Sequence, residues 1–351
     1  MTERMVRVPA ATLRTFAELA FAAAGVPTRD ASTIADALVD ADLRGVHSHG
    51  TRWVPSYVEQ LRRGGTNPRP DVRVVEDGGT TAVVDGDLGL GHVVASAAND
   101  LAIERALAGG VGAVALARST HCGAMAYYTN RAAARGCVGF AVTNGNANMA
   151  PTGGTSRLVG NNPLAYSFPT RRGFTFALDM ATSVVAGSRL LMAIERGEKI
   201  PPGWALDRDG RPTEDPRDWR ERDGLLVPIG GPKGYGLALV IEILSGVLSG
   251  GHFGPRRGQP GSVGTSQFFL AIRIDRFMPL EAFLDRMDTL IEQIKSSELA
   301  PGSPGVFLPG EIEQNNKNDR LTNGIPLDDT TIDALGALAL ELGLPRPGGK
   351  E

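Results

Sequence analysis

The spacing of apolar residues near the start of the chain predicts two helices. Apolar residues recur at helical spacing over residues 13–24 and again over residues 34–41, as expected for helices with one buried face. The segment Gly25-Val26-Pro27-Thr28 interrupts this pattern, and Gly45 ends the second helix. We therefore expect an N-terminal helical region.

From about residue 80 onwards, runs typical of strands are mixed with runs typical of helices. Strands are expected over residues 81–85, 111–117, 138–143, 164–168, 174–178 and 267–274. Helices are expected over residues 93–107, 124–134, 235–248, 280–294 and 332–342, and the largely apolar helix 235–248 is expected to be buried. Residues 197–232 are dense in Gly, Pro, Asp and Arg, which predicts a long loop. This mixture predicts an α/β or α+β fold.

The composition is that of a globular enzyme. The chain has 351 residues, more than the roughly 250–300 residues of a single core, so we expect two or three lobes. A net charge of −3 argues against a nucleic-acid partner. Cys122 and Cys137 provide no disulfide framework. No signal segment is recognised, and no apolar run reaches the roughly 20 residues of a membrane span, so we expect a cytoplasmic protein.

The common nucleotide-binding motifs are absent from the sequence. Gly86, Gly89 and Gly91 follow the order G-x-x-G-x-G and not the G-x-G-x-x-G of a Rossmann fold. Lys233 lies in a glycine-rich loop, but no Ser or Thr follows it as a phosphate-binding loop requires. These residues by themselves therefore do not predict a Rossmann fold or identify a dehydrogenase.

The first candidate cluster, Gly45-Val46-His47-Ser48-His49-Gly50-Thr51-Arg52, follows the second predicted helix. Histidine exchanges protons near neutral pH, and arginine matches the geometry of a carboxylate. The alternative is a pair of loop histidines without a joint role. A metal site is disfavoured because no third ligand is evident and alternate residues of an extended chain point to opposite faces. We expect no metal.

The second cluster, Ser119-Thr120-His121-Cys122-Gly123, follows a predicted strand and precedes a predicted helix. Catalytic residues favour such edges, but a helix-capping Ser or Thr beside a structural histidine is an equally good interpretation. Cys122 is a weaker candidate nucleophile because nothing in the sequence orients it.

Two further clusters combine amide, carboxylate and glycine residues. The third runs from Asn144 through Asn148 to Asn161-Asn162-Pro163, where the alternative is a purely structural loop. The fourth joins Asp179-Met180-Ala181-Thr182-Ser183 to the Lys233 loop. Asp179 could hold a ribose hydroxyl, orient a histidine or cap the helix expected to follow it. Lys233 could meet a phosphate or be solvated.

In this order, the clusters resemble the type-2, non-Rossmann malate/L-lactate dehydrogenase family. That family also contains ureidoglycolate and sulfolactate dehydrogenases, diketogulonate reductases and Δ1-piperideine-2-carboxylate reductases. The resemblance covers nearly the whole chain. It also rests on Tyr57, Tyr127-Tyr128, Ile200-Pro201-Pro202-Gly203-Trp204-Ala205, Asp215-Pro216, Gly234-Tyr235-Gly236-Leu237-Ala238 and Leu308-Pro309-Gly310-Glu311.

The resemblance implies a non-Rossmann NAD(P)-binding fold with a largely antiparallel central sheet and an N-terminal helical region. It divides the chain into a helical region at residues 1–75, a cofactor-binding and catalytic domain at residues 76–260, and a C-terminal α/β portion at residues 261–351 that completes the first lobe. It also implies a homodimer with the active site near the subunit interface.

The resemblance also implies roles for individual residues. The catalytic residues are His121 as acid/base, His49 and Ser48, and the substrate contacts are Arg52, Asn144 and Tyr57. The cofactor contacts are His49, His121, Gly123, Gly145, Asp179, Met180, Ala181, Thr182, Lys233, Pro309, Gly310 and Glu311. The stretch Gly145-Asn146-Ala147-Asn148-Met149 departs from the family pattern close to the expected substrate site, which leaves the substrate open.

The implied activity is the NAD(P)-dependent interconversion of a small 2-hydroxy acid and its 2-oxo acid. One alternative is a ketimine reductase acting on cyclic or N-alkyl 2-imino acids, and a more distant one is a cofactor-binding protein without turnover. The sequence leaves NAD and NADP open, because Arg118 and Arg157 are available for a 2′-phosphate.

Overall fold

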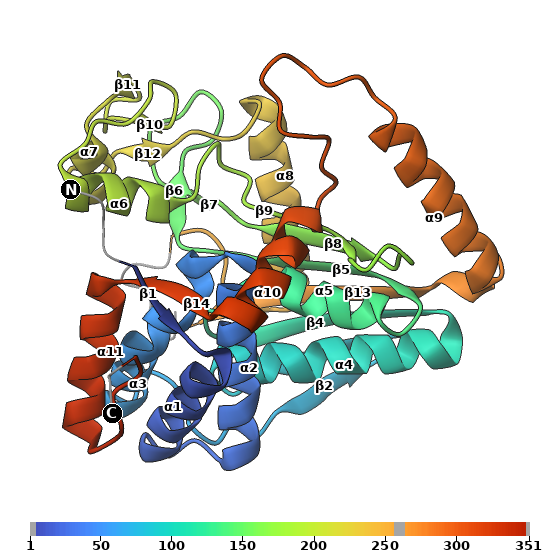
Figure 1. The fold of residues 1–351 in the computed structure, drawn as a ribbon, viewed down its shortest axis with the longest axis horizontal. Helices are drawn as coiled ribbons and strands as arrows, with labels where there is room; N and C mark the ends of the chain where they lie inside the picture. Colours follow the sequence, from blue (N-terminus) through green and yellow to red (C-terminus); the bar gives the residue numbers. More distant parts are fainter. Residues whose placement is uncertain (1–4, 256–263, 349–351) are drawn as a thin grey trace.

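The computed structural model describes residues 5–255 and 264–348, and a seven-stranded sheet forms their centre (Figure 1). Its strands follow the order β2-β3-β4-β13-β5-β8-β9, and only the β3–β4 pair is parallel. The strands are β2 (Arg73–Asp77), β3 (Thr81–Asp85), β4 (Val111–Ser119), β5 (Cys137–Thr143), β8 (Leu164–Phe168), β9 (Phe176–Met180) and β13 (Thr265–Arg273). The predicted mixed fold with a largely antiparallel central sheet is confirmed.

Two helices cover one face of this sheet. The helix α4 (Gly91–Gly109) packs on β4 and β13, and α5 (Ala126–Ala133) packs on β5 and β8. Their apolar sides meet the sheet in a core that includes Val94, Tyr128 and Phe269. A third helix, α9 (Leu280–Lys295), follows the short 3-10 helix Ile274–Arg276 after β13.

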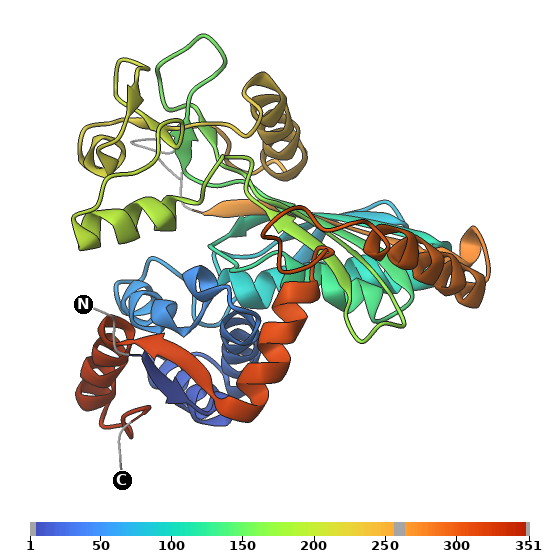
Figure 2. The ribbon, with the colours of Figure 1, turned by 45° about the horizontal axis from the view of Figure 1, so that its top comes forward.

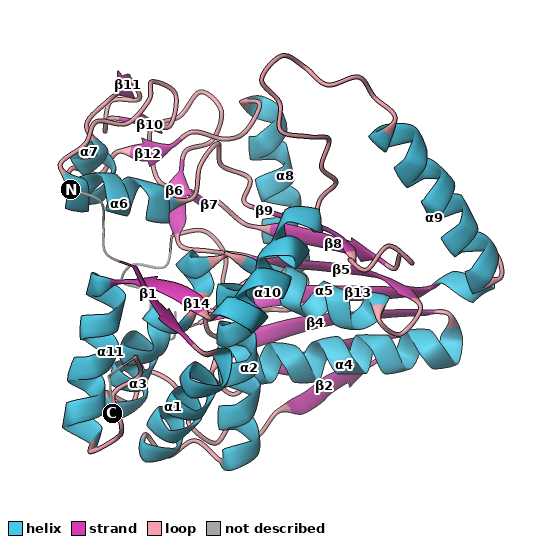
Figure 3. Ribbon diagram, in the orientation of Figure 1, coloured by secondary structure: helices cyan, strands magenta, loops and turns pink. Residues whose placement is uncertain are grey.

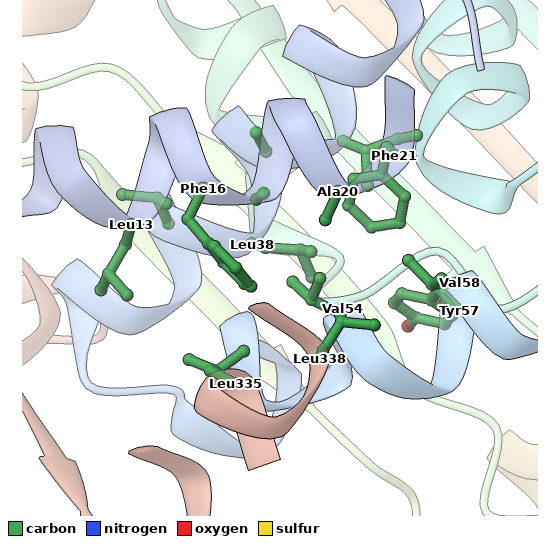
Figure 4. Close-up of a cluster of buried hydrophobic side chains, with 14 of the residues drawn as sticks. Leu13, Phe16, Ala20, Phe21, Leu38, Val54, Tyr57, Val58, Leu335 and Leu338 are labelled. Atoms are coloured by element: carbon green, nitrogen blue, oxygen red, sulfur yellow. The ribbon is translucent and has the colours of Figure 1, made fainter. Parts of the chain in front are cut away.

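The first and last parts of the chain form a helical lobe together (Figure 2). The strands β1 (Met5–Val8) and β14 (Ile325–Asp328) pair antiparallel, so the two ends of the chain meet. The helices are α1 (Ala10–Ala23), α2 (Thr28–Arg44), α3 (Val54–Arg62), α10 (Glu311–Asn323) and α11 (Asp329–Leu342). One apolar core joins α1, α2 and α3 to α11, through residues such as Phe16, Leu38, Val54 and Leu335 (Figure 4).

The strand β13 bears on the expected division into domains. It belongs to the range 261–351, expected to complete the first lobe, yet it is hydrogen-bonded between β4 and β5 at the centre of the sheet. A strand that is hydrogen-bonded to neighbours along both edges belongs to the same structural unit as the rest of its sheet. The division into domains stays a prediction, but β13 lies in the central sheet together with strands of the expected range 76–260.

Residues 197–232 are not the long loop that the sequence predicts. This region carries β10 (Ala205–Leu206), β11 (Pro212–Thr213), α7 (Pro216–Glu221) and β12 (Leu225–Leu226) (Figure 3). The three strands form a small sheet in the order β11-β10-β12. The helix α7 starts at a proline, and the side chain of Asp215 accepts a hydrogen bond from the Arg217 N–H at its start. The strands are too short to produce a recognisable alternating pattern.

The remaining elements surround this small sheet. They are α6 (Gly187–Arg196), α8 (Pro232–Glu242), a π-helical turn (Ile243–Val247) and the strands β6 (Ala147–Met149) and β7 (Val159–Gly160), which pair antiparallel. The expected buried helix 235–248 corresponds to α8 and the π-helical turn. It is buried on one side only: Leu237, Val240, Ile243, Val247 and Leu248 are each 46–55% exposed. The single chain leaves this apolar stripe uncovered.

The helix α10 was not evident from the sequence pattern. None of its residues is buried, so it has no apolar stripe to reveal a helical period. It packs against α2, and its start brings Pro309 and Gly310 to the cleft described below.

Candidate active site

A cleft of about 540 Å³ lies between the helical lobe and the edge of the sheet. Its walls come from α2, the turn before α5, β9 and the segment leading into α10. Seven of the residues predicted from the sequence line it: His49, Gly123, Asp179, Met180, Ala181, Pro309 and Gly310. Segments far apart in the sequence therefore meet at one hollow.

Beside this cleft, His121 is held by Tyr57. The hydroxyl group of Tyr57 lies 2.5 Å from Nδ1 of His121. Tyr57 is only 1% exposed and packs into the apolar core of the helical lobe (Figure 4), whereas His121 is open to solvent. No hydrogen bond joins Nε2 of His121 to another residue in the described part of the chain. The ring is thus fixed at one nitrogen and free at the other.

The second histidine of the cluster, His49, stacks on His121 with ring centroids 5.4 Å apart. The hydroxyl group of Ser48 lies 2.9 Å from Nδ1 of His49, so its Nε2 is the nitrogen available to the cleft. Trp53 adds a tilted contact to His121 at 5.7 Å, and its indole N–H donates to the Ser48 carbonyl at 2.6 Å. The expected catalytic trio Ser48, His49 and His121 is therefore assembled in one place.

The turn that carries Ser48 and His49 is fixed by a buried carboxylate. Asp42, at the end of α2, accepts hydrogen bonds from the Thr51 N–H (2.8 Å) and hydroxyl (2.6 Å). Its other oxygen lies 2.9 Å from Nδ1 of His47. The Arg320 guanidinium, which only donates, contacts Nε2 of His47 at 2.9 Å. His47 is therefore held at both ring nitrogens in this turn. Among the residues described, no group of acidic, histidine and cysteine side chains is arranged to hold a metal.

The surroundings of the histidines favour their neutral forms. Burial lowers the pKa of His49 to about 4. One side of His121 is exposed, but the surrounding protein excludes water from the rest of the ring. This burial, together with the neighbouring His49 and His92, lowers the pKa of His121 well below 6.5. Burial raises the pKa of Tyr57 well above 10, so its hydroxyl keeps its proton. At neutral pH the pair is thus a neutral imidazole and a neutral phenol.

Asp179 sits inside β9 and caps a helix from another part of the chain. Its carboxylate accepts a hydrogen bond of 2.8 Å from the Ala126 N–H at the start of α5. The sequence predicts that Asp179 ends its strand just before a helix, but β9 continues to Met180 and the next helix, α6, begins at Gly187. Burial raises the pKa of Asp179 to about 6, although the carboxylate remains open to the cleft.

Two predicted cationic contacts are unpaired in the described part of the chain. Arg52, next to Trp53, has no hydrogen bond or ion pair to a described residue. The same holds for Lys233, which is exposed at the start of α8 and does not line the cleft. The loop before Lys233 lies near residues 179–182, which are predicted to contact the cofactor, since the Ile229 N–H donates to the Thr182 carbonyl at 2.8 Å.

Asn144 and Gly145 lie in a buried network and not on the cleft wall. Asn144 is 1% exposed, and its amide nitrogen donates to the Glu242 carboxylate (3.3 Å) and the His252 carbonyl (2.7 Å). The Gly145 N–H donates to Asn162, whose amide nitrogen donates to Glu242 at 2.6 Å. Asn144 as a substrate contact stays a prediction that its burial does not favour.

The remaining predicted contacts, at Glu311, Thr182 and the two arginines, do not line the cleft. Glu311 forms an ion pair of 2.6 Å with Lys295 and accepts from the Leu308 N–H, which fixes the turn before α10. Thr182 is fully buried. Arg118 pairs with Asp85 and Asp87, and Arg157 donates to the Gly224 carbonyl, so the two arginines considered for a 2′-phosphate lie elsewhere.

Two residues near the site were not singled out from the sequence. His92 is fully buried at the start of α4 and contacts Tyr57. Asn130, in α5, lines the cleft; its side-chain oxygen accepts from Ser167, while its buried amide nitrogen has no partner in the described part of the chain. The signal for His92 was its position directly after the Gly86, Gly89 and Gly91 cluster. Asn130 had no signal, because its helix faces the cleft only in the folded chain.

Comparison with known proteins identifies the family. Residues 8–336 match the family model described as malate/L-lactate dehydrogenase. The chain belongs to this family. Like its named relatives, which are dehydrogenases, it is an oxidoreductase.

Members of the malate/L-lactate dehydrogenase family resemble the chain along almost its whole length. It is 42% identical to an L-sulfolactate dehydrogenase of Methanocaldococcus jannaschii over 91% of this chain and 92% of the relative. A solved sulfolactate dehydrogenase from that organism has a TM-score of 0.88, with 39% identity over 96% and 98% of the two chains. A malate dehydrogenase of Pyrococcus abyssi is 39% identical over 97% and 96% of the chains.

One structural neighbour has a different named activity. The Δ1-piperideine-2-carboxylate reductase of Pseudomonas syringae pvar. tomato has a TM-score of 0.85 and 28% identity, covering 95% of this chain and 99% of that chain. Family membership therefore fixes the type of enzyme but not the atom attached to the reacting carbon.

Proposed function

We propose that this protein interconverts a small 2-hydroxy acid and its 2-oxo acid with NAD or NADP. The observation that carries the proposal is the 2.5 Å contact between Tyr57 and Nδ1 of His121, with Nε2 left free beside the cleft. An imidazole held at one nitrogen and open at the other is suited to exchange a proton with a bound substrate.

During oxidation, Nε2 of His121 takes the proton of the substrate hydroxyl group. The neutral ring must offer a lone pair there, so its hydrogen sits on Nδ1 and is donated to the Tyr57 oxygen. Because the pKa of Tyr57 is raised well above 10, Tyr57 remains a phenol, and its oxygen can accept this hydrogen bond. In reduction, the Nε2–H of the imidazolium returns the proton to the 2-oxo oxygen.

Arg52 is the proposed anchor of the substrate carboxylate. It directly precedes Trp53, which contacts His121, and its guanidinium has no partner among the described residues. A planar guanidinium binds a carboxylate through two parallel N–H bonds, which orients C2 as well as binding it. The named activities of the relatives make sulfopyruvate and oxaloacetate the first 2-oxo acids to test.

The residues of the cleft fit a nicotinamide dinucleotide. The accessible Asp179 carboxylate can accept from ribose hydroxyls, and the unpartnered amide nitrogen of Asn130 is a donor without an acceptor in the described chain. Met180, Ala181, Pro309 and Gly310 provide the surrounding wall. A bound nicotinamide supplies the hydride acceptor or donor for C2 of the substrate.

The alternative substrate is a cyclic or N-alkyl 2-imino acid. The likeness to the piperideine-carboxylate reductase favours it, and the same His121 would then exchange a proton with nitrogen. The stretch from Gly145 to Met149, which departs from the family pattern, is the region to compare if imines prove to be substrates.

A homodimer is the proposed assembly. The stripe of half-exposed apolar residues on α8 and the π-helical turn would be covered by a second copy of the chain, because an apolar patch of this kind marks an interaction surface. The structure describes no helix long and apolar enough to cross a membrane. A cytoplasmic location remains part of the proposal.

A substrate panel tests the proposed activity. Pyruvate, oxaloacetate and sulfopyruvate are incubated with NADH or NADPH, then pyruvate with methylamine, and then Δ1-piperideine-2-carboxylate, while the nicotinamide absorbance is followed. Turnover of an oxo acid without amine supports the hydroxy-acid reaction. Turnover of the imines alone would show that the protein is a ketimine reductase and not a hydroxy-acid dehydrogenase. Cofactor binding without turnover of any of these substrates would indicate a cofactor-binding protein without activity.

A further inference from the structure

His92 is a fully buried histidine whose ring contacts Tyr57, the residue that holds the proposed acid/base His121. It lies in the first turn of α4, its exposure is 0%, and neither ring nitrogen has a hydrogen-bond partner in the part of the chain that the structure describes. Buried polar groups are nearly always hydrogen-bonded. An unpartnered imidazole at this buried position therefore needs an explanation, which an apolar side chain such as leucine would not.

Two glycines keep His92 close to the His121 turn. A Cβ atom on Gly91 would lie 2.3 Å from the Thr120 carbonyl oxygen and 2.5 Å from that of His121, so α4 starts in direct contact with this backbone. The Gly91 N–H donates to the Thr120 hydroxyl at 2.9 Å. Gly123 has a φ of +75°, and a Cβ atom there would lie 2.9 Å from Nε2 of His92. The turn thus leaves room for the imidazole.

The flat ring of His92 meets Tyr57. The two ring centroids are 5.4 Å apart and the ring planes are inclined by 71°, an edge-to-face arrangement. This geometry allows an imidazole N–H to point at the π face of Tyr57, a weak hydrogen bond that suits a donor lacking an oxygen acceptor. On its other side, Tyr57 holds Nδ1 of His121.

His92 does not exchange protons itself at working pH. Burial, with a smaller contribution from His49, lowers the pKa of His92 to about 3, so the ring stays neutral. It has no surface open to the cleft. Its ring contact with Tyr57 gives it a route to His121.

We propose that His92 is a positioning residue whose ring N–H holds the face of Tyr57, so that the Tyr57 hydroxyl fixes Nδ1 of His121. The inference rests on the proposed role of His121. It predicts that the side chain at position 92 controls the tautomer and orientation of a histidine that it does not touch by hydrogen bonding.

The test compares two substitutions of similar bulk. His92→Leu removes the N–H, whereas His92→Gln keeps an N–H donor at a similar reach. For His92→Leu we expect kcat to fall by about ten- to a hundredfold, the scale of a small misplacement of catalytic groups, with little change in the NADH dissociation constant. His92→Gln should recover most of this loss. Adding Tyr57→Phe to His92→Leu should cause little further loss, because each change by itself already frees Nδ1 of His121 from the Tyr57 hydroxyl group.

A structural role alone predicts a different pattern. Equal losses in the Leu and Gln variants, or losses that multiply in the double variant, would overturn the proposal. If His92→Leu fails to fold, His92→Phe takes its place, because phenylalanine keeps a flat ring at position 92 but has no N–H; a loss in His92→Phe that His92→Gln does not share supports the proposal, and equal activity in the two overturns it.

Nitrogen NMR of the His121 ring separates this inference from the proposed activity. In the wild-type protein the hydrogen of the neutral ring should reside on Nδ1, and in His92→Leu the two tautomers should become mixed. This measurement needs no substrate. An unchanged tautomer in a folded His92→Leu protein would refute the positioning role even if the wild-type enzyme turns over a substrate. A changed tautomer would support the positioning role even if no turnover is found.

Discussion

Tyr57 and His121 are 64 positions apart in the sequence, yet the Tyr57 hydroxyl lies 2.5 Å from Nδ1 of His121. Tyr57 belongs to α3 and the apolar core of the helical lobe, whereas His121 follows the sheet strand β4. The contact therefore spans the two main parts of the molecule. The proposed acid/base is oriented by a residue whose position depends on how these parts pack.

Replacing His121 should abolish most turnover without removing the cofactor site. We expect His121→Gln to lower kcat by about 10²–10⁴-fold, the usual cost of losing one positioned acid/base. The dissociation constant for NADH, measured by fluorescence, should change little, because the cleft wall is made by other residues. A folded His121→Gln protein with full turnover would reject the assignment.

Removing the guanidinium of Arg52 should weaken substrate binding. A charge-assisted hydrogen bond contributes about 1.5–3 kcal/mol, so Arg52→Ala should raise KM for the acid by roughly ten- to a hundredfold. Arg52→Lys should recover part of this loss, as it keeps the charge but not the planar fork. Arg118→Ala serves as the control, because Arg118 pairs with Asp85 and Asp87. An unchanged KM in Arg52→Ala would exclude the proposed anchor.

The two directions of the reaction should respond oppositely to acid. The pKa of His121 lies well below 6.5, so its neutral, proton-accepting form persists below that pH. We expect kcat/KM for hydroxy-acid oxidation to stay level from pH 8 to below 6.5 and to fall only in more acidic buffer. Reduction should accelerate as the pH is lowered, because it needs the imidazolium. A fall in the oxidation rate centred at or above pH 6.5 would contradict this expectation.

The buried histidines should also make the fold sensitive to acid. The pKa of His92 is about 3 in the folded chain and near 6.5 when unfolded, so between these values the unfolded chain binds more protons. The free energy of unfolding should therefore be fully retained above pH 6.5 and decrease as the pH falls toward 3. Urea unfolding at several pH values measures this slope. His92→Leu should show a shallower slope, and an identical slope in the two proteins would argue against the buried neutral ring.

Substitutions at Asp179 should separate its two contacts. Asp179→Ala removes the acceptor for the Ala126 N–H at the start of α5 and should destabilise the fold by about 1 kcal/mol, as for a lost helix cap. Asp179→Asn keeps an oxygen acceptor, so its melting temperature should be closer to that of the wild type. Both changes remove the charge proposed to bind ribose and should weaken NADH binding by roughly tenfold. Wild-type NADH affinity in both variants would count against the ribose contact.

The sequence was informative where a residue and its neighbours act within one element. The helical spacing before Gly45 corresponds to α1 and α2, and several expected strands correspond to sheet strands. The order of short motifs along the chain predicted the family, and the match of residues 8–336 to the family model confirms it. The predicted catalytic residues Ser48 and His49 lie on one turn, so adjacency in the sequence becomes adjacency in space.

The packing of separate segments decided the rest. Asp179 caps α5 and not the helix that follows it, because β9 runs alongside the start of α5. Asn144 meets Glu242 in the interior, and Tyr57 of α3 contacts His92 of α4 although the two helices pack into different apolar cores. Hydrophobic burial is not directional, so the sequence pattern identifies which side of a helix is buried but not what lies opposite. The identity of the site's residue types thus came from the sequence alone, while their pairing came from the tertiary structure.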